Sequence, residues 1–173
     1  MIQDKVVIGT WPLSGAYGTV DLETVQRTLE CCYYNNFKEF DVAPSYGDGF
    51  IEFCIAKVLG NKSDISINTK IGNMPFSDKS FKVVDLRKSI DQSLKRLSLD
   101  SLNILFLHNP RNDIDDQKGV LEFMKMLKKD GKIRHIGISL AKNHKYDLNF
   151  LQEFDVIQDD GNLLDMRFHD LQL

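Results

Sequence analysis

Short apolar runs alternate along the chain with longer stretches in which apolar residues recur at helical spacing. A short continuous apolar run is typical of a strand that is covered on both faces, so these runs predict strands. Residues that follow the runs at spacings of three and four predict amphipathic helices. The predicted strands are Lys5–Gly9, Glu39–Asp41, Ile65–Thr69, Leu102–Leu107, Ile133–Ile138 and Val156–Gln158.

Five helices are predicted between these strands. They cover Asp21 to about Asn35, Ile51–Leu59, Asp85–Leu97, Gln117–Lys129 and about Lys145–Gln152. Asp21 and Asp85 are expected to act as N-caps, because an aspartate oxygen accepts hydrogen bonds from the free N–H groups of a first turn. Gly60 and Gly131 are expected to end the second and fourth helices.

Strict alternation of strands and helices predicts parallel βαβ units with right-handed connections. Two α/β architectures have this pattern: an open doubly wound sheet and part of a closed (β/α)8 barrel. The pattern alone does not separate them. No linker, low-complexity tract or repeat divides the sequence, so residues 1–173 are predicted to form a single domain.

The composition is that of an ordinary globular protein, with 173 residues, 42% hydrophobic, 27% charged and a net charge of −3. This balance gives no reason to expect nucleic acid or an anionic membrane as a partner. The first residues lack the layout of a signal peptide, so a cytoplasmic location is expected. The three cysteines have no CxxC spacing, and no metal site is predicted.

Chemically distinct polar residues follow three successive strands. Asp41 ends the second strand, Tyr46 lies in the loop behind it, Lys70 ends the third strand and His108 ends the fourth. The carboxyl ends of parallel strands meet at one edge of a sheet, where α/β proteins place their functional sites. The four residues are therefore expected to form one catalytic site.

Their chemistry fits proton transfer to a carbonyl group. A tyrosine with a pKa near 10 is a poor acid at neutral pH, but a nearby lysine cation favours the phenolate and lowers that pKa. An aspartate can hold the lysine in place, and a histidine can donate a hydrogen bond to the carbonyl oxygen. No side chain supplies hydride, so reduction of the carbonyl would need a cofactor.

These segments resemble the aldo-keto reductases, NAD(P)H-dependent oxidoreductases on a (β/α)8 barrel. The matching stretches are VVIGTWPLSG, EFDVAPSYGDGFIE, INTKIG, SLKRLSLDSLNILFLHNP, GKIRHIGIS and FDVIQDDGNLLD, in the order of the family. The resemblance implies that Tyr46 is the general acid, that Lys70 and Asp41 tune it, and that His108 orients the carbonyl of an aldehyde or ketone.

The resemblance also implies a set of cofactor-binding residues, with NADPH favoured over NADH. Ser139 and Gln158 match positions that hold the nicotinamide carboxamide, but Leu140 stands where the family has an asparagine. Thr10 and Trp11 lie where the family lines the cofactor and substrate cleft. Asp41 belongs to the cofactor-binding set as well as to the catalytic one.

The family barrel has eight strands, whereas six are predicted here, so we expect an incomplete, truncated barrel that lacks the last two βα units. Such a barrel would expose unpaired strand edges. Two hypotheses follow: an NAD(P)H-dependent reductase of small carbonyl compounds, and a catalytically silent truncated barrel. The silent barrel would be a binding or structural subunit that completes itself with a partner chain, for example as a homo-oligomer joined through the open edge.

Overall fold

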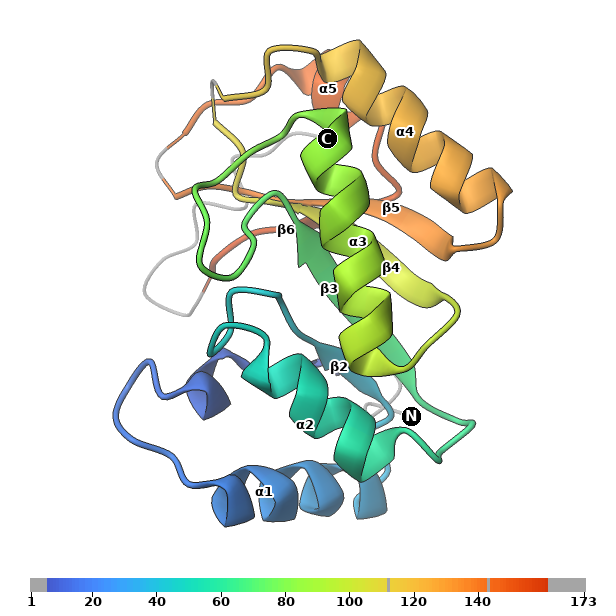
Figure 1. Ribbon diagram of the computed structural model, residues 1–173. Coiled ribbons are helices and arrows are strands. Elements are labelled where there is room, and N and C mark those ends of the chain that lie inside the picture. The colour runs from blue at the N-terminus through green and yellow to red at the C-terminus, as the bar shows by residue number, and fades with distance from the viewer. Residues whose placement is uncertain (1–5, 112, 143, 162–173) are drawn as a thin grey trace.

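Six parallel strands form one sheet in which each strand lies beside its neighbours in chain order, from β1 to β6 (Figure 1). The computed structural model describes residues 6–111, 113–142 and 144–161. The strands are β1 (Ile8–Gly9), β2 (Glu39–Asp41), β3 (Ser66–Ile71), β4 (Leu102–His108), β5 (Ile133–Ser139) and β6 (Val156–Gln158).

A helix follows each of the first five strands and covers the outer side of the curled sheet (Figure 1). The helices are α1 (Leu22–Tyr34), α2 (Phe50–Leu59), α3 (Val83–Leu97), α4 (Gln117–Lys129) and α5 (Leu148–Leu151), and a short 3-10 helix, η2 (Trp11–Ser14), follows β1. A doubly wound sheet reverses its strand order at a switch point, but this sheet does not. The fold is therefore an incomplete (β/α)8 barrel, and the open-sheet alternative is wrong.

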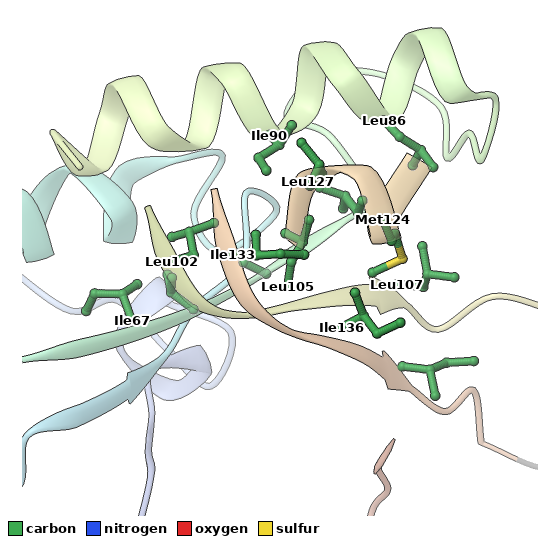
Figure 2. Packing of buried hydrophobic residues seen from close by; sticks show 14 of the residues in the cluster. Ile67, Leu86, Ile90, Leu102, Leu105, Leu107, Met124, Leu127, Ile133 and Ile136 are labelled. Carbon is green, nitrogen blue, oxygen red and sulfur yellow. The ribbon is translucent and has the colours of Figure 1, made fainter. Parts of the chain in front are cut away.

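Apolar side chains between the sheet and its helices hold the strands in place. Leu86 and Ile90 of α3 and Met124 of α4 pack over Leu105 and Leu107 of β4 (Figure 2), and each of these residues is at most 1% exposed. Burial of one such side chain contributes roughly 1.5–3 kcal/mol. This packing fixes the strands, and with them the edge of the sheet at which the polar residues lie.

The first strand and the last helix are shorter than predicted. The first strand was predicted from Lys5, which lies outside the described residues, but Val6 and Val7 are exposed and the strand is Ile8–Gly9. Its ladder is short because β2, its partner in the described residues, has three residues. The helix α5 is shorter than predicted and begins after Asp147, whose side chain accepts a hydrogen bond from the Asn149 N–H.

Of the two predicted N-caps, Asp21 is confirmed and Asp85 is wrong. Asp21 caps α1 as expected, since its Oδ1 accepts a hydrogen bond of 2.6 Å from the Thr24 N–H. Asp85 does not cap α3, because that helix begins two residues earlier, at Val83. Asp85 lies in the first turn instead, where its carboxylate accepts a hydrogen bond of 2.8 Å from the Ser80 hydroxyl.

Candidate active site

The four predicted catalytic residues lie at the carboxyl edge of three adjacent strands. Asp41 is the last residue of β2, His108 is the last residue of β4, and Lys70 lies one residue before the end of β3. Tyr46 lies in the loop between β2 and α2, and Lys70 donates a hydrogen bond of 3.1 Å to its hydroxyl. The prediction that strand ends bring these residues together therefore agrees with the structure.

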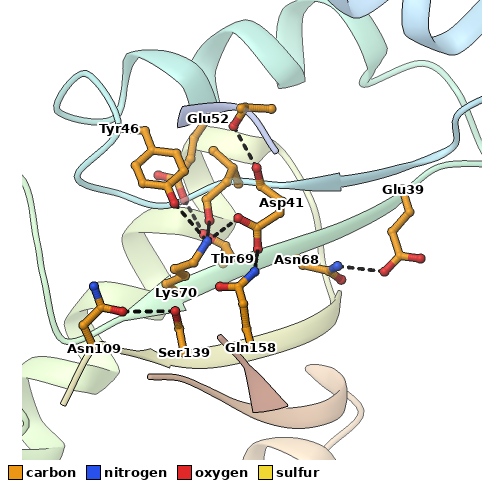
Figure 3. Close-up of polar contacts among 12 residues, drawn as sticks. Glu39, Asp41, Tyr46, Glu52, Asn68, Thr69, Lys70, Asn109, Ser139 and Gln158 are labelled. Carbon is orange, nitrogen blue, oxygen red and sulfur yellow. Dashed lines mark hydrogen bonds and ion pairs between the residues drawn. The ribbon is translucent and has the colours of Figure 1, made fainter. Parts of the chain in front are cut away.

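Lys70 is the centre of the site. Its ammonium donates to Asp41 Oδ1, to the Val42 carbonyl at 3.2 Å and to the Tyr46 hydroxyl at 3.1 Å (Figure 3). An ammonium has three N–H donors, so all three have an acceptor. Lys70 is 2% exposed and Asp41 is 7% exposed. A buried charge requires such complete pairing, because an unpaired one would carry a large desolvation cost.

Burial governs the protonation of Tyr46 and Lys70. It raises the pKa of Tyr46, and the negative charges of Asp41 and Asp160 raise that pKa further. This is the opposite of the predicted direction, because burial disfavours the charged phenolate. Burial lowers the pKa of Lys70, and the carboxylate of Asp41 opposes that shift. Tyr46 therefore holds its proton at neutral pH.

His108 lies beside Tyr46, with the two ring centres 6.3 Å apart and the planes 80° to each other. Burial, followed by the positive charges of Lys70 and Lys79, lowers the pKa of His108 to about 3. The imidazole is therefore neutral at physiological pH and carries one N–H donor. Its Nδ1 is buried and has no hydrogen-bond partner among the described residues.

Trp11 packs edge-on against the ring of Tyr46, with the ring centres 5.0 Å apart. Trp11 is 42% exposed, so the indole that packs on Tyr46 also faces solvent. Its neighbour Thr10 is fully buried, and its hydroxyl donates a hydrogen bond of 2.8 Å to the Asp41 carbonyl. Thr10 therefore holds the end of β2 in place.

A buried ion pair supports the turn that carries Tyr46. Glu52, in the first turn of α2, is 0% exposed and accepts hydrogen bonds from Arg96 Nε at 2.6 Å and from the Thr69 hydroxyl at 3.0 Å. Thr69 precedes Lys70 in β3, so the hydrogen bond between Glu52 and Thr69 ties the start of α2 to the strand that carries Lys70. Sequence reasoning assigned no role to Arg96. Glu52 could have indicated such a partner, because an acidic residue inside an otherwise apolar helical run needs a cation when it is buried.

The remaining predicted residues lie at the ends of β5 and β6. Gln158 Nε2 donates a hydrogen bond of 3.2 Å to Asp41 Oδ2, so β6 contributes to the same network (Figure 3). The Ser139 hydroxyl donates a hydrogen bond of 3.1 Å to Asn109 Oδ1. Asn109 was not predicted, although it follows His108 directly at a strand exit. Leu140 is buried.

Within residues 6–111, 113–142 and 144–161, no group of three or more His, Cys, Asp or Glu side chains is arranged to hold a metal ion. Over the same residues, every helix is too short or too polar to cross a membrane.

Comparisons with known proteins give a consistent result. Residues 5–156 match the Aldo/keto reductase family. The L-galactose dehydrogenase of Arabidopsis thaliana is 32% identical over 140 residues, which are 78% of this chain and 44% of that protein. The chain spans about half the length of the curated relatives that it matches first.

Solved structures share the fold at low sequence identity. The glycerol dehydrogenase of Gluconobacter oxydans has a TM-score of 0.81 at 22% identity, over 98% of this chain and 55% of that one. An aldo/keto reductase from Klebsiella pneumoniae, solved in complex with NADP and acetate, has a TM-score of 0.64 at 23% identity, over 85% and 48% of the two chains.

Proposed function

The chain belongs to the aldo/keto reductase family, and we propose that it carries the proton-transfer site of an NAD(P)H-dependent reductase that converts an aldehyde or ketone to an alcohol. One observation carries this proposal. The buried Lys70 ammonium contacts Asp41 and the Tyr46 hydroxyl at once, beside a neutral His108. A structural ion pair would not need a phenol as a third partner.

The direction of the hydrogen bond decides what Tyr46 can do. Lys70 donates to the phenol oxygen, so the hydrogen of the Tyr46 hydroxyl is free to point at a carbonyl oxygen in the site. As that proton leaves, the phenolate oxygen already faces the Lys70 ammonium, which stabilises the developing charge. The raised pKa of Tyr46 keeps the proton in place until the carbonyl oxygen gains negative charge.

The other two residues position the reacting groups. Asp41 holds the Lys70 ammonium against the phenol, and its second oxygen is held by Gln158. His108 is the proposed donor to the carbonyl oxygen, since its neutral imidazole lies beside the phenol ring and carries one N–H. A carbonyl oxygen between Tyr46 and His108 would receive a hydrogen bond from each.

A nicotinamide cofactor, when bound, supplies the hydride to the carbonyl carbon. Asp41, Ser139 and Gln158 are the proposed residues around its nicotinamide, and Trp11 is proposed to line the cleft. Thr10 is expected to act through Asp41, because its hydroxyl is already bonded to the Asp41 carbonyl. NADPH is favoured over NADH by family resemblance and by the NADP complex of the Klebsiella pneumoniae relative.

The test is reduction of small aldehydes by the purified chain, followed as loss of NADPH absorbance. Tyr46→Phe removes the acid while keeping the ring, and we expect it to lower the rate by about 10²- to 10⁴-fold. Tyr34→Phe is the matched control, because Tyr34 is 74% exposed at the end of α1. A Tyr46→Phe protein that works at the wild-type rate would refute the assigned acid.

A second function is favoured by the edges of the sheet. In the described residues, β1 pairs only with β2 and β6 pairs only with β5, so each leaves one edge open. The alternative is a catalytically silent subunit that pairs such an edge with a partner chain, for example a second copy of itself. Sedimentation velocity separates the two: a dimer without turnover supports the subunit, and a monomer that reduces aldehydes excludes it.

A further inference from the structure

We propose that Lys79 and Tyr146 are positioning residues for His108, because they hold the two backbone carbonyls that directly follow it. The inference rests on the proposed function, in which His108 donates a hydrogen bond to the carbonyl oxygen of the substrate. Both residues would act through the turn that leaves β4, and not by contact with the substrate. Together they would set where the imidazole lies.

The Nδ1 atom of His108 is buried and has no hydrogen-bond partner in the part of the chain that the structure describes. In histidines that act in catalysis, a hydrogen bond at one ring nitrogen usually fixes the role and direction of the other. Among the described residues, His108 lacks that bond, so packing and the backbone that carries the ring must fix its direction. The turn after His108 is therefore part of the site.

This turn has an unfavourable backbone conformation directly after His108. Asn109 has a φ of 51°, in the left-handed region, which asparagine enters more readily than most residues but which is still uncommon. Such a conformation persists only where the surrounding contacts determine it. The Asn109 N–H donates a hydrogen bond of 2.9 Å to the Ser139 carbonyl, which fixes one side of the turn. The carbonyls of Asn109 and Pro110 are held by side chains from two other loops.

Lys79 holds the first of these carbonyls from the loop between β3 and α3. Its ammonium donates a hydrogen bond of 2.6 Å to the Asn109 carbonyl and lies 2.9 Å from Asp113 Oδ2. Burial, then the charge of Lys70, then the charge of Lys79 lower the pKa of His108, so Lys79 is within electrostatic reach of the ring. Lys79 therefore ties the loop after β3 to the exit of β4 beside His108.

Tyr146 holds the second carbonyl from the loop between β5 and α5. Its hydroxyl donates a hydrogen bond of 2.5 Å to the Pro110 carbonyl and accepts one of 2.6 Å from the Ala141 N–H. The ring is partly buried against the core, and burial raises the pKa of Tyr146, so the hydroxyl keeps the hydrogen that it donates. Because β3 and β5 flank β4, the turn after His108 is held from both sides.

The first experiment compares the ring signals of His108 in proton–carbon correlation spectra of the full chain, which needs no turnover. His108→Gln identifies these signals by their loss. Tyr146→Phe removes only the hydroxyl, and Lys79→Met removes the ammonium but keeps the stem. We expect sharp His108 signals in the wild type and shifted or split ones in both variants. The signals of His135, which is half-exposed near the start of β5, should stay in place.

The second experiment is a double-mutant cycle on the rate of aldehyde reduction with NADPH. Tyr146→Phe and Lys79→Met are each expected to lower kcat about tenfold, because a misplaced donor stabilises the reacting carbonyl less well. In the His108→Gln protein, the same two substitutions should change kcat by less than about twofold, since the group that they position is gone.

The matched controls are Tyr34→Phe and Lys125→Met. Tyr34 is 74% exposed, and Lys125 makes an exposed pair with Glu153 at 2.5 Å, so neither change should alter the His108 signals or kcat. Unchanged His108 signals in either test variant would remove that residue from the proposal, and unchanged signals in both would overturn it, whether or not the chain reduces aldehydes. Equal rate losses with and without His108 would also overturn it. A wild type without turnover would refute the proposed function, and the spectra alone would then decide the positioning.

Discussion

Replacing Arg96 with methionine removes the cation that is paired with the fully buried carboxylate of Glu52. The carboxylate keeps the Thr69 hydroxyl as a donor but loses the Arg96 Nε–H at 2.6 Å. Methionine retains an unbranched stem, which matters because the arginine stem packs closely on Gly49, where an added β-carbon would lie 2.9 Å from Arg96 Cδ. The substitution therefore removes the positive charge while it keeps the packing of the side-chain stem.

The magnitude follows from the burial of the two partners. Removing one member of a buried ion pair costs about 3–5 kcal/mol, because the other charge stays desolvated. Arg96 is 25% exposed and Thr69 still contacts the carboxylate, so we expect a loss near the lower end, about 3 kcal/mol.

The assay is urea denaturation at neutral pH, followed by far-ultraviolet circular dichroism. Arg27→Met is the matched control, since Arg27 makes an exposed pair with Glu23 in α1, at 3.8 Å with both side chains more than 75% exposed. Such pairs contribute about 0.3–0.5 kcal/mol. If Arg96→Met loses no more stability than Arg27→Met at neutral pH, the Glu52 pair does not support the turn that carries Tyr46, and our reasoning fails.

Two further predictions concern pH and steric fit. The lowered pKa of His108, about 3, favours the neutral ring in the folded state, so its contribution to stability is present above pH 6.5 and is lost as the pH falls towards 3. The free energy of unfolding should therefore fall less between about pH 7 and about pH 5 in His108→Gln than in the wild type, by about 2 kcal/mol. Urea denaturation at the two pH values measures this, and identical losses in the two proteins would contradict it. Gly72→Ala should destabilise by at least about 2 kcal/mol in thermal melts, because Gly72 has a φ of 104° and its β-carbon would lie 2.3 Å from the Phe81 ring. Gly9→Ala, with nothing within 4 Å, is the control, and equal melting shifts would contradict the clash.

Much of the fold was readable from the order of apolar runs. The segments Gln117–Lys129 and Val156–Gln158 have the predicted bounds, because a heptad-like apolar stripe and a short apolar run between polar turns are strong local signals. The cap of α3 was mispredicted because the helix begins at Val83, two residues before Asp85, and the Asp85 carboxylate accepts from the Ser80 hydroxyl instead. The length of β1 was overestimated, since the length of an edge strand depends on its partner.

The sequence by itself determined the chemistry: which residue types follow the ends of the strands, and hence that Asp41, Tyr46, Lys70 and His108 meet at one edge. Parallel strands align their carboxyl ends, so this proximity follows from the alternation of elements alone. Tertiary structure decided the choice of half-barrel over open sheet, because strand order is set by packing between elements that are distant along the chain. It also decided that the pKa of Tyr46 is raised and not lowered, because desolvation depends on which side chains cover the phenol. The hydrogen bond between Ser139 and Asn109 likewise depends on neighbours from another strand, which no local pattern records.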